Sequence, residues 1–198
     1  MLFDRLKNYE IILATRSPRR HQLMKGAGFD FEIVAPKDED ESYPDYLSVN
    51  EVAKYLAKKK ALPLIENLNK NEILITADTI VILENKVLGK PSDIEEARKM
   101  LNDLSGKTHV VETAVCLAFR NNIVIFNDIT KVHFRSLLTD EIEYYVNNYK
   151  PFDKAGSYGA QEWIGYIAIE HIEGSYFNVM GLPIDKVYTE LDKFITAF

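Results

Sequence analysis

The sequence first suggests anion binding, at a turn that carries three arginines. The apolar residues 11–14 predict a strand, and Ser17, followed by a proline, predicts the start of a helix. Arg19 and Arg20 would then lie in the first helical turn, where free backbone N–H groups disfavour cations. With Arg16 nearby, three guanidinium groups and unpaired backbone donors predict a site for a phosphate or polyphosphate. The alternative is that all three arginines point into water.

An aspartate interrupts the most apolar segment of the sequence, residues 72–83. Asp78 lies there between an alanine and Thr79. Burying a carboxylate is unfavourable unless it is paired, binds a metal ion or faces an opening, so Asp78 is predicted to be a metal ligand or general base. The alternative is a strand-end aspartate that caps a turn.

Three further polar side chains could take part in the same chemistry. Lys60 and Lys90 could pair with phosphates, although a single lysine is usually solvated. Gln161 offers both a donor and an acceptor, which suits the edge of a nucleobase or a ribose. These residues predict an anion-binding α/β protein but define no reaction, and the sequence contains neither GxxxxGK[ST] nor GxGxxG.

The segments that must position these residues alternate between strands and helices. After the first strand, further strands are expected at 30–36, 72–83, 108–119, 122–134 and 165–172. Capping boxes, Ser48 with Glu51 and Ser92 with Glu95, predict helices through 51–61 and from 92 to about 104. Thr139 is expected to cap a further helix, and a last helix is expected to begin near Pro183.

Turn signals bound these elements. Pro63 should end or kink the second helix, and Gly106 can end the third in a left-handed conformation. Residues 84–86 and 120–122 predict hairpins, which exclude an all-parallel sheet. Loops are expected at 37–45, which is acidic, at 150–161, which is a candidate functional segment, and at 173–183.

Composition excludes several classes of protein. The 198 residues are 46% hydrophobic and 27% charged, typical of one globular domain. No apolar run is long enough to span a membrane, and no signal-peptide pattern is seen, so a cytoplasmic location is expected. The formal charge of −6 argues against nonspecific nucleic-acid binding. Cys116 lies in an apolar run and reads as a buried structural thiol, and the four histidines lack metal-site spacing.

Six blocks of residues resemble the Maf family of nucleoside triphosphate pyrophosphatases, once described as septum-formation inhibitors. The blocks are "LATRSPRR", "LAKKKA", "ADTIV" with "LGKP", "LSGKTHVVETAV", "DKAGSYGAQ" and "GSYFNVMGLP". They occur in the family's order and approximate spacing from about Ile11 to Pro183. The resemblance implies a single Maf-like domain, 1–198, with a mixed twisted sheet, flanking helices and two lobes around a deep cleft, similar to the inosine triphosphatases.

The activity implied by the resemblance is hydrolysis of a nucleoside triphosphate to the monophosphate and pyrophosphate, with Mg²⁺ or Mn²⁺ as cofactor. In the family, the aspartate of the "ADT" block is the proton acceptor, which implies Asp78 as catalytic residue and metal ligand. A glutamate after the second strand also helps with the metal, which here implies Glu41, with Asp40 as the alternative register. The residues implied in phosphate binding are Ser17, Arg19, Arg20, Lys60 and Lys90.

Substrate choice in the family is linked to three positions, here Arg19, Thr79 and Gln161. This combination is similar to the branch that acts on dTTP and UTP, in which the enzyme removes noncanonical nucleotides. Pyrophosphatase activity on 7-methyl-GTP and a non-enzymatic role in cell division are the alternatives. No nucleic-acid or membrane partner is expected, and a two-fold homodimer is the default form of a soluble oligomer.

Overall fold

The computed structural model describes residues 1–36 and 40–197, and the chain divides into two compact units. Unit 1 comprises Met1–Asp78, Thr113–Asp128 and Gly181–Phe198, and unit 2 comprises Thr79–Glu112 and Ile129–Met180. Three of the four unit boundaries fall inside the long strands β3, β5 and β6, so each of these strands contributes residues to both units, and the fourth follows Met180.

The strands form one mixed seven-stranded sheet. They are β1 (Glu10–Ala14), β2 (Glu32–Val34), β3 (Glu72–Leu83), β4 (Lys86–Leu88), β5 (Thr108–Phe119), β6 (Asn122–Phe134) and β7 (Ile169–Glu173). Their order is β2-β1-β3-β5-β6-β7, and β4 pairs with β3. β1 is parallel to β2 and β3, whereas β4 is antiparallel to β3 and β7 to β6. The predicted mixed α/β class is therefore confirmed.

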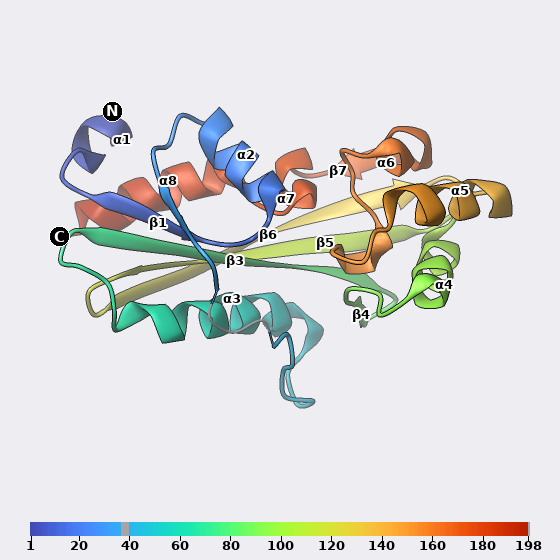
Figure 1. Ribbon diagram of the computed structural model, residues 1–198, viewed down its shortest axis with the longest axis horizontal. Coiled ribbons are helices and arrows are strands. Elements are labelled where there is room, and N and C mark those ends of the chain that lie inside the picture. The colour runs from blue at the N-terminus through green and yellow to red at the C-terminus, as the bar shows by residue number, and fades with distance from the viewer. Residues whose placement is uncertain (37–39, 198) are drawn as a thin grey trace. The chain divides into compact units, whose positions relative to one another are not determined.

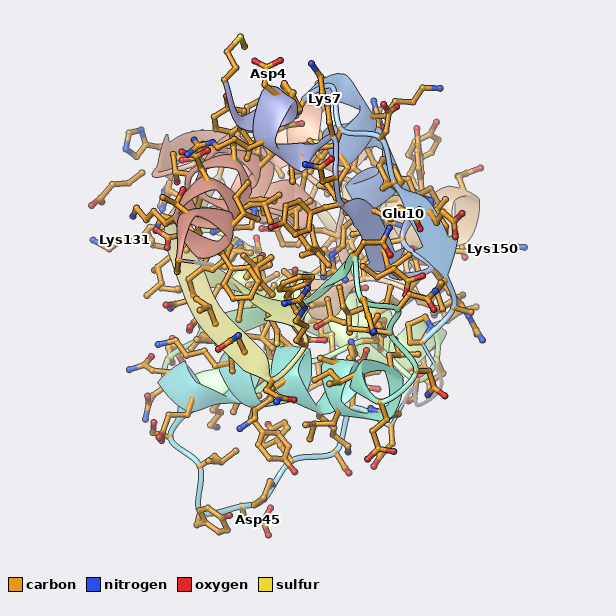
Figure 2. All side chains as sticks on the ribbon, turned by 90° about the vertical axis from the view of Figure 1, so that its left-hand side faces the viewer. Asp4, Lys7, Glu10, Asp45, Lys131 and Lys150 are labelled. Carbon is orange, nitrogen blue, oxygen red and sulfur yellow. The ribbon has the colours of Figure 1, made fainter. Side chains whose placement is uncertain are left out.

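Unit 1 has helices on both faces of its part of the sheet. They are α1 (Leu2–Leu6), α2 (Pro18–Gly26), α3 (Val49–Ile65) and α8 (Ile184–Thr196). Figure 1 shows α3 on one face and α1, α2 and α8 on the other. Because both faces are covered, β1 and the first half of β3 are almost continuously apolar and buried. Charged side chains lie outside: Asp4 and Lys7 pair on α1 at 3.0 Å (Figure 2).

The helices of unit 2 surround an aromatic core. They are α4 (Ile94–Leu104), α5 (Thr139–Tyr149), the 3₁₀ turn η1 (Ala155–Ser157), α6 (Trp163–Ala168) and α7 (Tyr176–Met180). The rings of His109, Phe134 and Tyr158 pack edge to face, with centroids 4.9 to 5.3 Å apart. This cluster joins β5 and β6 to the segment that follows η1.

Local signals located most helix ends correctly. Ser17 is the N-cap of α2 with proline at the first helical position, and Ser48 caps α3 reciprocally with Glu51. Gly106 takes a φ of +69° just beyond the end of α4. Glu84 and the asparagine after it both have positive φ, as a tight β3–β4 hairpin requires.

Two N-cap predictions were wrong by one residue. The N-cap of α4 is Asp93 rather than Ser92, because the Asp93 carboxylate accepts the Glu96 N–H at 2.8 Å. The N-cap of α5 is Leu138 rather than Thr139. α3 continues two residues past Pro63 and ends within one turn of it, since proline supplies no backbone N–H and crowds the preceding turn.

Two element predictions were wrong in type. Residues 163–168 are helical and only 169–173 form a strand, whereas a strand was expected over 165–172. Gly165 lets this helix pack closely, since a Cβ there would lie 2.0 Å from the Ala160 carbonyl oxygen. Residues 176–180, expected in a loop, form α7. Short apolar runs do not distinguish helix from strand locally, so tertiary packing decided both cases.

Burial agrees with the expectation for Cys116. Cys116 lies in the core, and burial raises the pKa of its thiol to about 11. Among residues 1–36 and 40–197, no helix combines the length and the apolar character that crossing a membrane requires.

Candidate functional site

In unit 1, two carboxylates meet one ammonium group. α3 carries Lys60, whose Nζ contacts the carboxylate of Asp78 on β3 and lies 3.4 Å from Oε1 of Glu41. Asp78 is almost fully buried, its side chain being 6% exposed. Burial raises the pKa of Asp78, and Lys60 and then Arg20 oppose that rise. The nearby charge of Glu41 raises the pKa of Asp78 further.

The structure distinguishes the two candidate residues of the acidic loop. Asp40 lies 2.7 Å from Nζ of Lys59 and accepts hydrogen bonds from Ser42. Glu41 instead lies beside Lys60, close enough to influence the pKa of Asp78. Residues 37–39 of this predicted loop lie outside the described residues.

The turn from β1 to α2, which carries the three arginines, is organised around Arg20. Its Nε donates to the Gly181 carbonyl oxygen at 2.7 Å, and Nη1 donates to that of Ala77 at 2.9 Å. Burial lowers the pKa of the Arg20 guanidinium, and the charges of Asp78 and Glu41 oppose that effect. Arg20 therefore tolerates the helix start because carbonyl oxygens and carboxylates within unit 1 stabilise its charge.

The other residues of this turn are arranged differently. Arg16 is exposed, and Ser17 and Arg19 are half-buried. The backbone N–H of Ser17 donates to Oγ1 of Thr15 at 3.2 Å. Thr15 is itself buried, and its hydroxyl also lies 3.4 Å from Nη1 of Arg20. Arg16 is thus more exposed than either Arg19 or Arg20.

Unit 2 carries the other three predicted residues. Thr79 follows Asp78 on β3, Lys90 is exposed after β4, and Gln161 lies between η1 and α6. The Gly156 N–H donates to the Gly89 carbonyl oxygen at 3.0 Å, so the segment before Gln161 is bonded to the segment that carries Lys90. Gly156 has a φ of +66° and sits against Val81, which leaves no room for a Cβ.

The Gln161 side chain is half-buried, and its Oε1 has no hydrogen-bond partner in the described part of the chain. Since buried acceptors are normally satisfied, such an atom calls for a donor from a ligand or from water. A nucleobase N–H is one donor of this kind.

Sequence reasoning missed a buried polar network next to Gln161. Lys154 is 6% exposed, and its Nζ lies 2.7 Å from Oδ1 of Asp153 and 3.0 Å from Oε1 of Glu162. The hydroxyl of the buried Tyr145 donates to the other oxygen of Glu162. A lysine inside the glycine-rich segment 150–161 was a signal, but Tyr145 on α5, which joins the network through Glu162, could not be identified from spacing.

Carboxylates at Asp78 and Glu41 suit a divalent cation such as Mg²⁺, which commonly binds one or two protein carboxylates, waters and substrate phosphates. Within residues 1–36 and 40–197, no group of three or more His, Cys, Asp or Glu side chains is placed to hold a metal ion. The donor set therefore fits a metal ion that arrives with phosphate ligands rather than a closed structural site.

Comparisons with known proteins identify the family of this chain. The "dTTP/UTP pyrophosphatase" of Bacteroides fragilis is 52% identical over 94% of this chain and 96% of that protein. A protein of the same name from Phocaeicola vulgatus is 48% identical over 97% of this chain and all of that protein. A HAM1 protein from Coxiella burnetii shares the fold, with a TM-score of 0.50 at 14% identity over 93% of this chain and 99% of that one. The sequence model described as "Maf-like protein" matches residues 10–194, and the chain belongs to this family.

Proposed function

We propose that the protein hydrolyses dTTP and UTP to the nucleoside monophosphate and pyrophosphate. Relatives about 50% identical over nearly the whole chain carry the name dTTP/UTP pyrophosphatase. The observation that carries the chemistry is the buried carboxylate of Asp78, held against Lys60 beside Glu41. A carboxylate with a raised pKa is a stronger base than a solvated one and suits proton abstraction from water.

In the proposed reaction, Asp78 accepts a proton from the attacking water. The water oxygen bonds to the α-phosphorus, the bond from that phosphorus to the bridging oxygen breaks, and pyrophosphate leaves. Negative charge grows on the phosphoryl oxygens, and Arg19, Lys60 and Lys90 are assigned to stabilise it. Ser17 and Arg20 shape the phosphate-binding turn. A divalent metal bound by Asp78 and Glu41 would supply further charge neutralisation when present.

Thr79, Gln161 and Arg19 are proposed to select the substrate. Gln161 offers an acceptor that lacks a partner within the described residues, which suits the imide N–H of uracil and thymine. We further propose that residues 1–198 act as one Maf-like domain, because the family match spans segments of both units. Its proposed compartment is the cytoplasm, where nucleoside triphosphates are made, and its proposed form is a two-fold homodimer.

The test is pyrophosphate release from dTTP, UTP, CTP, GTP and 7-methyl-GTP with Mg²⁺ or Mn²⁺. Asp78→Asn should abolish turnover of dTTP and UTP. Asp128→Asn, which alters a carboxylate of unit 1 paired with Lys186, is the matched control and should retain it. Preference for 7-methyl-GTP would overturn the substrate assignment alone. No turnover of any triphosphate by the wild type would overturn the proposed enzyme function and favour a regulatory role.

A further inference from the structure

We propose that the buried Lys154–Glu162 ion pair and the Tyr145 hydroxyl position Gln161 and fix its amide to recognise uracil and thymine rather than cytosine. This inference rests on the proposed function, because it explains how the pyrimidine would be chosen. It assigns positioning roles to three residues of unit 2 that the proposed chemistry does not use.

The ion pair closes the ends of a short segment. Lys154 immediately precedes η1 and Glu162 immediately follows Gln161, so their contact at 3.0 Å joins both ends of residues 155–161. The pair is shielded, with side-chain exposures of 7% for Lys154 and 21% for Glu162. An interaction removed from water is screened less than a surface pair, so this contact can hold a defined geometry.

Tyr145 fixes the middle of the same segment. Its hydroxyl accepts the Gly159 N–H at 3.1 Å and donates to Glu162. Burial is the main cause of a raised pKa at Tyr145, and its bond to Glu162 acts in the same direction, so the hydroxyl remains a donor. One oxygen therefore links α5, the backbone of the segment and the ion pair.

The backbone of the segment is strained, which shows that its surroundings determine its shape. Ser157 is fully buried and has a φ of +63°, a left-handed conformation unfavourable for a residue with a side chain. Such a conformation persists where the surrounding contacts over-determine it. The bond from Gly156 to Gly89 and the bond from Gly159 to Tyr145 flank this residue and supply those contacts.

Gly159 places the Gln161 amide next to the ion pair. A Cβ on Gly159 would lie 3.0 Å from Nε2 of Gln161, 3.0 Å from Cδ of Glu162 and 3.1 Å from Cε of Lys154. The amide nitrogen therefore borders the same small space as the carboxylate. A carboxylate attracts the N–H end of an amide and repels its oxygen, so Glu162 favours the orientation in which Oε1 is left for a ligand.

This orientation distinguishes the pyrimidines. Uracil and thymine present an N–H donor at N3, which can satisfy Oε1 of Gln161, whereas cytosine presents an acceptor at that position. A site whose buried polar group is left unpaired by the wrong ligand discriminates strongly against it. Without the ion pair, the Gln161 amide could flip, so that Nε2 instead of Oε1 faces the base and donates to N3 of cytosine.

The experiment compares kcat and KM for UTP and CTP in the wild type, Lys154→Met, Glu162→Gln and Tyr145→Phe. The variants should reduce the UTP-to-CTP ratio of kcat/KM about tenfold or more, mainly through a higher KM for UTP. Lys131→Met is the matched control, since Lys131 pairs with Glu173 in the same unit but is 54% exposed (Figure 2). It should leave the ratio unchanged.

A double-mutant cycle separates positioning from general stability. If Lys154 acts through Gln161, then Lys154→Met should not further change the UTP-to-CTP ratio of kcat/KM in a Gln161→Ala background. Equal changes in both backgrounds, or a lower melting temperature with an unchanged ratio, would overturn the inference. Tyr145→Phe removes one oxygen and covers the case in which Lys154→Met does not fold. In Tyr145→Phe, the backbone amides of residues 155–162 should exchange hydrogen faster than in the wild type. Unchanged exchange would contradict the proposed anchoring of this segment by the Tyr145 hydroxyl.

Failure of this inference and failure of the proposed function give different results. A wild type that hydrolyses UTP and CTP equally overturns the inference and leaves the pyrophosphatase chemistry intact. A wild type that hydrolyses neither removes the proposed function, and the inference with it.

Discussion

The ammonium group of Lys60 on α3 contacts the carboxylate of Asp78, so a helix residue influences the charge of a residue buried in the sheet. Lys60 opposes the protonation that burial favours at Asp78. The same ammonium lies 3.4 Å from Glu41 and balances a second negative charge. An ammonium group shared in this way reduces the repulsion between the two carboxylates.

Replacing Lys60 should shift the pH dependence of the reaction. In Lys60→Met, the pKa of Asp78 should rise further, because an opposing positive charge is lost. Since the ionised carboxylate is the proposed base, the acid limb of log kcat/KM should move to higher pH. Lys59→Met is the control, because Lys59 pairs with the exposed Asp40. If the acid limb lies at the same pH in Lys60→Met and in the wild type, Lys60 does not set the pKa of the catalytic base, whatever the value of kcat.

Arg20 should prove necessary for stability as well as for activity. Its bonds to the Ala77 and Gly181 carbonyl oxygens tie α2 to two other segments of unit 1. Arg20→Met should lower the free energy of unfolding by about 1–3 kcal/mol, because buried acceptors lose charged donors. Urea unfolding measures this, with the exposed Arg16→Met as control. Equal stability of the two variants would show that the carbonyl groups find other partners.

His109 should make stability depend on pH. Burial lowers its pKa from 6.5 to about 3, and Nε2 lies 2.7 Å from the Tyr158 hydroxyl. Between these pH values the unfolded chain binds a proton that the folded chain does not, so the unfolding free energy falls as pH decreases from 6.5 to about 3. The loss attributable to His109 is on the order of a few kcal/mol.

His109→Gln should flatten this part of the pH profile of unfolding, even if the variant is less stable at every pH. The exposed His171→Gln should leave the slope unchanged. If His109→Gln keeps the wild-type slope of unfolding free energy against pH, another titratable group causes the pH dependence.

Metal removal should affect activity and stability unequally. Two protein carboxylates bind Mg²⁺ weakly without phosphate oxygens, so chelation should abolish pyrophosphate release but leave the melting temperature of the nucleotide-free protein nearly unchanged. Added Mg²⁺ or Mn²⁺ should restore the activity. A large fall in melting temperature on chelation would instead indicate a structural metal site.

The sequence predicted most secondary structure because the signals are local. Ser48 with Glu51 satisfies backbone donors within one helical turn, and Gly106 adopts its left-handed conformation without a side-chain penalty. The helix at 163–168 escaped prediction because its geometry depends on the close approach of Gly165 to Ala160. A hydrophobic pattern of that length is compatible with either element.

By itself, the sequence determined the mixed α/β class, the family and the chemical types available: basic residues after the first strand, a carboxylate in an apolar strand, and an amide in a glycine-rich segment. Tertiary structure alone decided that Glu41 rather than Asp40 lies beside Lys60, that Arg20 binds carbonyl groups, and that Lys154 and Tyr145 meet at Glu162. Local propensity acts over a few residues, whereas burial, pKa shifts and ion pairing depend on side chains that are distant in sequence and adjacent only after folding.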